Sequence, residues 1–141
     1  MEYRKGLLFL LIAIELILAL YMVFENPSSG FCASGSGCTN VQNSIYSKFS
    51  LFGMEFKLTE FAVLAFVILI VVYYLVYKEK VHYRFFLACS GIGAALAISF
   101  ICIQLFVLKQ ICSNCMIVDT LAIIIFIIAL IEYPIARAKK I

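Results

Sequence analysis

Four long apolar stretches constrain this chain more than any other feature of its sequence. They run over residues 7–24, 58–77, 85–108 and 112–131, and crossing the hydrocarbon core of a bilayer takes about 20 helical residues. Inside lipid every backbone polar group has to be paired within the protein, which favours helices. The sequence therefore predicts an all-α integral membrane protein, a bundle of four transmembrane helices.

Composition supports this class and argues against others. The 141 residues are 65% hydrophobic, whereas a soluble domain is about half apolar. The net charge is only +3, and we interpret it as a signal of membrane topology rather than a nucleic-acid surface. The first stretch is long and lacks a small-residue cleavage site close behind it, so we interpret it as a span rather than a signal peptide. We expect residues 1–141 to form a single membrane domain.

The basic residues predict how the four spans are oriented. Eight of the eleven Lys and Arg residues flank one side of the spans: Arg4, Lys5, Lys78, Lys80, Arg84, Arg137, Lys139 and Lys140. The positive-inside rule then places both termini in the cytoplasm. The loop over residues 25–57 and the turn over 109–112 are expected to face outward from the plasma membrane, in the compartment where disulfides persist.

The outward loop contains a pliable part and an apolar part. Glycines and serines surround Cys32 and Cys38, which gives this pair a flexible carrier. Further on, apolar residues recur at spacings of three or four: Val41, Ile45, Phe49, Phe52 and Phe56. This spacing predicts a short amphipathic helix that lies on the membrane surface as a lid over the bundle.

Two cysteine pairs carry the chemistry that the sequence indicates. Cys32 and Cys38 lie in the outward loop, and Cys112 and Cys115 form a CxxC motif at the start of the last span. The first turn of a helix stabilises a thiolate, which is the species that attacks disulfides. Cys115 is one turn deeper on the same face. We therefore predict that all four are catalytic, with Cys112 meeting the loop pair and Cys115 meeting a lipid-soluble acceptor.

Two alternatives use the same four thiols. They can form two static disulfides or a tetrahedral zinc site. A CxxC bridge closes too short a loop to stabilise a fold strongly, and a zinc site on a pliable outward loop is unusual, so we expect redox chemistry and no metal. Cys89 and Cys102 lie within the third span among small residues, and we expect them only to pack against neighbouring helices.

Asp119 is the acidic residue that the sequence marks most clearly. It follows Cys115 by four residues and so shares its helix face, one turn deeper. A carboxylate within a span by default marks a function. Asp119 can exchange a proton with the acceptor or bond to its carbonyl, or instead bond to Ser99 or Gln104 across a helix interface. Glu15 and Glu60 are weaker candidates for such a role.

These motifs resemble those of the vitamin K epoxide reductase family in its short microbial form. The loop pair precedes the CxxC motif, the CxxC motif opens the last span, and Cys38-Thr-Asn-Val41-Gln-Asn-Ser44 is similar to the family's Cys-x-x-Val-x-x-Ser segment. Gly53 fits the glycine that follows this segment. The DsbB family also has four spans and two cysteine pairs, but with the order of the pairs reversed.

The resemblance implies a four-helix bundle around a quinone, either ubiquinone or menaquinone, with Cys115 at its binding site. Asp119 is our own prediction for a second residue there, made from its place on the same helix face. The resemblance also implies that a separate thioredoxin-like (DsbA-like) partner exchanges with the Cys32–Cys38 disulfide, that Cys38 attacks at Cys112, and that Cys115 passes the electrons on. Asp119 stands where the animal enzymes have tyrosine, and residues 58–62 lack their asparagine. We therefore predict a disulfide-generating thiol oxidase. A vitamin K quinone or epoxide reductase and a structural or metal-binding membrane subunit are the alternatives.

Overall fold

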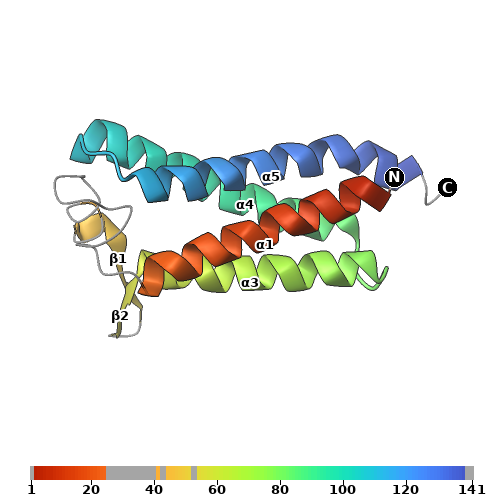
Figure 1. The fold of residues 1–141 in the computed structure, drawn as a ribbon, viewed down its shortest axis with the longest axis horizontal. Helices are drawn as coiled ribbons and strands as arrows, with labels where there is room; N and C mark the ends of the chain where they lie inside the picture. Colours follow the sequence, from red (N-terminus) through yellow and green to blue (C-terminus); the bar gives the residue numbers. More distant parts are fainter. Residues whose placement is uncertain (1, 25–40, 42–43, 52–53, 139–141) are drawn as a thin grey trace.

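The computed structural model describes residues 2–24, 41, 44–51 and 54–138. This part of the chain contains four long helices: α1 (Glu2–Phe24), α3 (Leu58–Tyr77), α4 (Tyr83–Cys102) and α5 (Ser113–Ala138). The shorter elements are a 3-10 turn η1 (Ile45–Ser47), strands β1 (Lys48–Leu51) and β2 (Met54–Lys57), and a π-helical turn η2 (Ile103–Leu108) that continues α4. The long helices lie side by side as a bundle, with the hairpin at one end (Figure 1).

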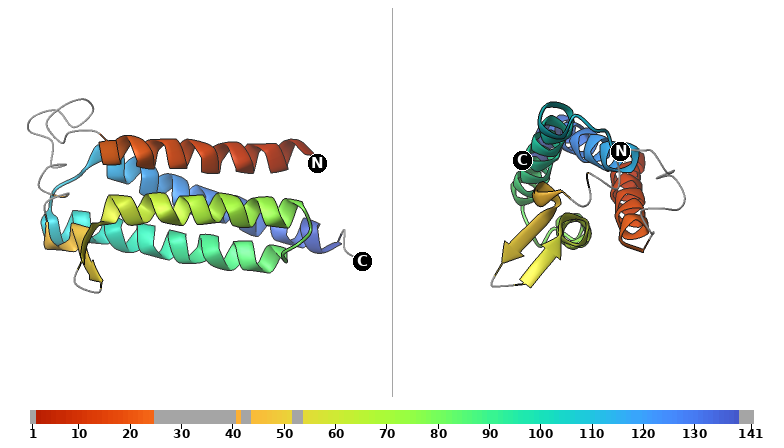
Figure 2. Two further views of the ribbon diagram at one scale, coloured as in Figure 1. Left: turned by 90° about the horizontal axis from the view of Figure 1, so that it is seen from below. Right: turned by 90° about the vertical axis from the view of Figure 1, so that its left-hand side faces the viewer.

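The four helices form a closed ring in the order α1, α3, α4, α5, each packing against the next and α5 packing back against α1. The end-on view in Figure 2 shows this ring. Helix α1 begins and α5 ends at the same end of the bundle, so these two neighbours run antiparallel (Figure 1). The opposite end therefore brings together the end of α1, the hairpin and the start of α5.

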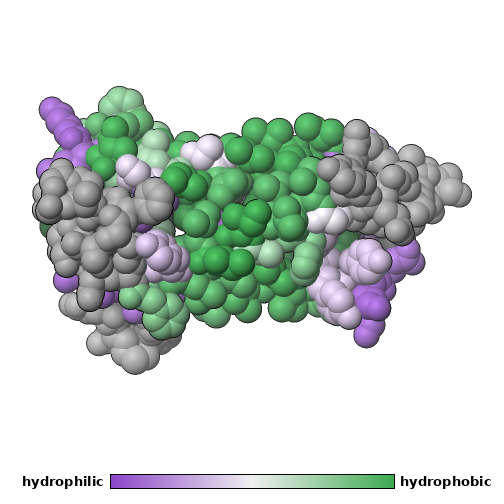
Figure 3. All heavy atoms as spheres, viewed as in Figure 1, coloured by the Kyte–Doolittle hydropathy of each residue, from purple (hydrophilic) through white to green (hydrophobic). Residues whose placement is uncertain are grey.

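The predicted transmembrane spans are confirmed. The helical segments long and apolar enough to cross a bilayer are Gly6–Phe24, Thr59–Tyr77, Tyr83–Leu108 and Ser113–Pro134. Most of their side chains point outward and are apolar, which suits lipid as the surrounding solvent. Figure 3 shows the result, a broad hydrophobic belt between more polar ends. The protein is a multi-pass membrane protein.

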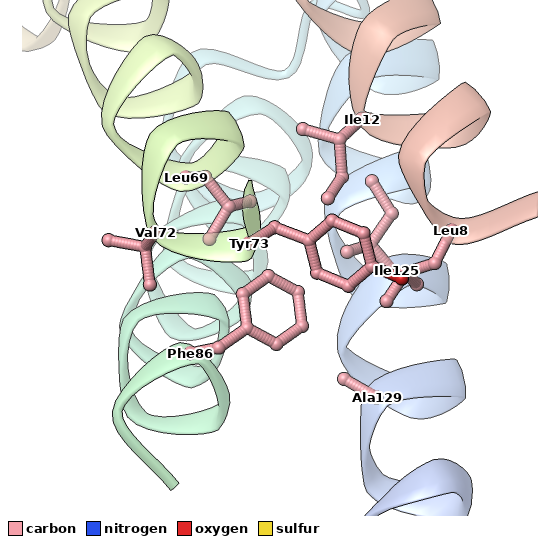
Figure 4. Packing of buried hydrophobic residues seen from close by; sticks show 8 residues of the cluster. All are labelled: Leu8, Ile12, Leu69, Val72, Tyr73, Phe86, Ile125 and Ala129. Atoms are coloured by element: carbon pink, nitrogen blue, oxygen red, sulfur yellow. The ribbon is translucent and has the colours of Figure 1, made fainter. Parts of the chain in front are cut away.

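An apolar core fills the half of the bundle that lies away from the hairpin. It contains Leu8, Ile12, Leu69, Val72, Tyr73, Phe86, Ile125 and Ala129, drawn from all four helices (Figure 4). The rings of Tyr73 and Phe86 lie 5.1 Å apart between centroids. Nearer the helix ends, the Tyr83 hydroxyl donates to the Ala129 carbonyl oxygen at 3.0 Å. These contacts join α3, α4 and α5 at the end of the bundle that lies away from the hairpin.

Small residues on α4 allow it to approach α5 closely, as the sequence predicts. Ser90, Ala94 and Ala97 are buried at spacings of four and three. A methyl group placed on Gly91 would lie 3.1 Å from the ring of Phe126 on α5, whereas one on Gly93 would meet nothing within 4 Å. Gly91 is therefore a site of close approach, because a larger side chain there has to displace an aromatic ring.

The lid helix expected over the apolar part of the loop is a wrong prediction for residues 48–51 and 54–57, which form two strands. After the turn η1, strand β1 pairs with β2 in antiparallel register, with Lys48 opposite Lys57 and Leu51 opposite Met54. The sequence explains the difference. From 48 to 57 apolar and polar residues alternate on either side of Phe52-Gly53, which is the period of a strand and competes with the spacing of three or four that the helix prediction used.

Candidate functional site

Cys112 is the residue that caps the start of α5. The helix begins at Ser113, and the Cys112 carbonyl accepts the backbone N–H of Met116 at 2.9 Å, the first bond of the helix. Cys112 thus lies one residue earlier than a first-turn position. The N–H groups of a helix's first turn have no partners within the helix and carry the positive end of its dipole. Cys112 therefore stands directly before these N–H groups, at the positive end of α5.

Cys112 and Cys115 lie together in a small apolar cluster at this end of the bundle. The cluster consists of Val41 and Cys112, both buried, with Leu108 and Cys115 packed against them. Cys112 is completely buried and Cys115 is half-buried. The structure thus brings the CxxC pair together with Val41, a residue that follows the outward loop pair in the sequence.

Val41 is held by a turn that its neighbour Ser44 closes. The Ser44 hydroxyl donates to the Val41 carbonyl oxygen at 2.7 Å, and the Ser44 backbone N–H reaches the same oxygen at 3.3 Å. A hydroxyl that bonds back to a carbonyl three residues earlier stabilises a local turn. Val41 and Ser44 are the two residues that resemble the family segment after Cys38, and of these Val41 packs against Cys112.

Gln104 bonds directly to the backbone of Cys112. Its side-chain oxygen Oε1 accepts the Cys112 N–H at 3.1 Å, and the side chain is almost fully buried. Gln104 belongs to the π-helical turn η2, which Lys109 ends with a left-handed φ of 49°. The Gln110 N–H then bonds to the Gln104 carbonyl oxygen at 3.2 Å. Gln104 therefore ties the end of α4 to the start of α5 at the reactive cysteine.

Sequence reasoning named Gln104 only as a possible partner of Asp119, and missed its bond to Cys112. The reason is the π-helical turn, which has a wider turn than an α-helix and so changes which residues face the interior. An α-helical projection of the third span misplaces the residues after Cys102. The one available signal was a polar residue late in an apolar span, eight residues before Cys112.

Two carboxyl groups lie deeper in the bundle. Asp119 is half-buried on α5, and Glu15 is fully buried on α1. Their helices, α1 and α5, pack against each other. Glu60 is exposed in the first turn of α3, where a negative charge suits the helix dipole. Glu15, which the sequence ranked with Glu60 as a weaker candidate, is thus the more deeply placed of the acids in this region.

The remaining predicted residues have separate outcomes. Cys32 and Cys38 lie outside the described residues. Cys89 is half-buried against the apolar core and Cys102 is exposed on the surface that faces lipid, and both have free thiols. The described ranges contain no group of three or more His, Cys, Asp or Glu side chains that could hold a metal ion.

Fold and site together define a class of protein. Four spans carry a pair of thiols at the head of the last one, one thiol buried and one partly accessible, with carboxyl groups beneath them in the membrane. Comparison with known protein families agrees: residues 6–130 match the vitamin K epoxide reductase family, and the chain belongs to this family. Its members are oxidoreductases that use quinones, so the protein is a membrane redox enzyme. No curated protein and no solved structure matches the chain.

Proposed function

We propose that the protein is a thiol oxidase that generates disulfide bonds and passes the electrons to a quinone. The observation that carries this proposal is the cluster of Val41, Leu108, Cys112 and Cys115. Val41 follows Cys38 by three residues, and three residues of chain reach at most about 11 Å. A connection this short keeps Cys38 within reach of the CxxC pair, which supports transfer between the two pairs.

The proposed orientation has both termini in the cytoplasm and the thiols on the outer side. Helix α1 begins and α5 ends at one end of the bundle (Figure 1), and the CxxC pair lies at the start of α5, at the other end. The turn between α3 and α4, with Lys78 and Lys80, belongs to the first end, as does Arg84 at the start of α4. Basic residues on that end favour the cytoplasmic side, so the thiols face the compartment in which disulfides form.

The proposed electron route uses all four cysteines in order. A reduced thioredoxin-like protein exchanges with the Cys32–Cys38 disulfide, becomes oxidised itself and leaves two thiols on the loop. The Cys38 thiolate then attacks Cys112 in the Cys112–Cys115 disulfide and releases Cys115 as a thiolate. Cys32 resolves the resulting Cys38–Cys112 bond, so the loop disulfide reforms and the CxxC pair holds the two electrons.

A quinone is the electron acceptor that the site fits, because the site combines hydrogen-bonding side chains with apolar surroundings. Spans of this composition enclose an apolar interior, and the Glu15 carboxyl inside it has no hydrogen-bond partner for either oxygen. A bound quinone supplies an acceptor for the two electrons and two protons that two thiols lose when they form a disulfide. In this proposal Cys115 and Asp119 face the bound quinone. Asp119 holds or delivers a proton at its carboxyl oxygens.

The test is a purified system with defined partners. The protein in detergent is mixed with a reduced DsbA-like protein and a soluble short-chain quinone, and the absorbance of the quinone is followed. We expect bleaching that is abolished in Cys112→Ala and Cys115→Ala. Cys32→Ala and Cys38→Ala should block oxidation of the protein substrate and spare that of a small dithiol.

Cys89→Ala and Cys102→Ala are the matched controls, because these thiols lie outside the cluster. Both should oxidise the partner at the wild-type rate. Quinone reduction that survives in Cys115→Ala would contradict the mechanism. Reduction of vitamin K epoxide by the wild-type protein, without oxidation of the thioredoxin-like partner, would instead support the vitamin K cycle alternative.

A further inference from the structure

Glu15 stands in the middle of the inward-facing stripe of α1. The stripe consists of Leu8, Ile12, Glu15 and Ala19, at spacings of four, three and four residues, each at most 2% exposed. These spacings keep all four on one helix face. The three other members are apolar, so the Glu15 carboxyl group occupies a position where the spacing predicts an apolar core side chain.

The Glu15 carboxyl has no hydrogen-bond partner among the residues that the structure describes. Three polar side chains are buried in the described residues: Glu15, Ser90 and Gln104. Ser90 donates to the Leu87 carbonyl oxygen at 3.1 Å and Gln104 accepts from Cys112, but neither oxygen of Glu15 has a hydrogen bond. Burying a polar group without a bond costs on the order of 1–3 kcal/mol. A ligand that forms a hydrogen bond with the Glu15 carboxyl would remove this cost.

The position of Glu15 along the bundle identifies where that ligand would lie. Ile12 belongs to the apolar core together with Ile125 of α5, and α1 and α5 are antiparallel neighbours (Figure 1). Glu15 lies three residues nearer the thiols than Ile12 on α1, about 4.5 Å along the helix, and Asp119 lies six residues nearer them than Ile125 on α5, about 9 Å. Asp119 in turn lies four residues, or about 6 Å along the helix, below Cys115. The two carboxyls thus occupy the layer between the apolar core and the thiol cluster.

We propose that Glu15 and Asp119 together form the hydrogen-bonding site for a quinone oxygen beneath the thiol pair. This inference rests on the proposed function and adds Glu15 to its site. A carboxylic acid donates to a carbonyl oxygen, and a carboxylate accepts from a hydroxyl. One carboxyl can therefore bond to the ligand both as a quinone and as a quinol, within otherwise apolar walls.

The experiment measures binding separately from turnover. A short-chain benzoquinone is titrated into the purified protein, and its dissociation constant is taken from the rise in Tm, since a ligand of the folded state stabilises it by mass action. The variants are Glu15→Leu, Glu15→Gln and Asp119→Asn. Glu60→Gln is the control, because Glu60 is an exposed carboxyl on a neighbouring helix.

We expect Glu15→Leu to weaken quinone binding about five- to tenfold, which corresponds to the loss of one hydrogen bond. Asp119→Asn should weaken it less, and Glu15→Gln should bind within about twofold of wild type because an amide also donates and accepts. Glu60→Gln should match wild type. Without quinone, Glu15→Leu should have a Tm at or above that of wild type, because it removes an unpartnered buried carboxyl.

Wild-type quinone binding in Glu15→Leu would overturn this inference and leave the proposed function standing. A Tm well below wild type in Glu15→Leu without quinone would also overturn it, because Glu15 would then be a structural residue. If the wild-type protein itself neither binds nor reduces the quinone, the proposed function fails as well. Thiol–disulfide exchange between the loop pair and the CxxC pair should be unchanged in every carboxyl variant.

Discussion

Gln104→Leu tests how the reactive end of α5 is held. The substitution conserves most of the side-chain volume but removes the oxygen that accepts the Cys112 N–H at 3.1 Å. Both groups are buried, so the N–H is left without a partner and without water. Leaving a buried donor unsatisfied costs about 1–3 kcal/mol. We expect the free energy of unfolding to fall by this amount.

Unfolding in mixed micelles, followed by the helical circular dichroism signal, measures this change. Gln110→Leu is the matched control: it is the same substitution six residues away, at a side chain whose Oε1 is buried without a hydrogen bond. It should change the unfolding free energy by less than about 0.5 kcal/mol or increase it. Equal losses in the two variants would refute the assigned role of Gln104. Faster alkylation of Cys112 in Gln104→Leu alone would give independent support, because its backbone anchor is gone.

Two further predictions concern packing. Gly91→Leu should lower the unfolding free energy by about 1–3 kcal/mol in the same unfolding assay. The reason is that it drives a side chain into Phe126, which lies 3.1 Å from the position of a Cβ on Gly91. Gly93→Leu is the control and should be neutral or stabilising. Similar effects at the two glycines would contradict the close approach of α4 to α5. Val41→Ala should lower the unfolding free energy by about 1–2 kcal/mol. It should also speed the alkylation of Cys112, measured by mass spectrometry, since Val41 packs over Cys112. An unchanged alkylation rate would show that Val41 does not cover Cys112.

Periodicity and length predicted the bundle well because lipid leaves few alternatives. Each predicted span agrees with the structure to within a few residues, since a stretch of about 20 apolar residues has to be helical to pair its backbone in hydrocarbon. The extramembrane segment was harder. Water satisfies the backbone of either a helix or a hairpin there, and the apolar residues from 45 to 56 fit both periods.

The candidate site also has a part that the sequence predicted and a part that it did not. Cys112 and Cys115 were predictable because two thiols three residues apart at a helix start have a recognisable chemistry. The bond from Gln104 to Cys112 was not, because it depends on a π-helical turn that shifts the inward face of the third span. Glu15 was named but ranked low, because the sequence shows its depth in the membrane and not which side of α1 faces the ring of helices.

The sequence by itself determined the number of spans, the gathering of most basic residues on one side of the spans, and the presence of paired thiols at the head of the last span. These properties follow from composition and local spacing. Only the tertiary structure decided that Val41 covers Cys112, that Gln104 anchors it, and that Glu15 lies on the buried face of α1, which packs against the helix that carries Asp119. Each depends on the rotation and the order of helices that are distant in the chain, and these are set by packing between helices, such as the close contact of Gly91 with Phe126.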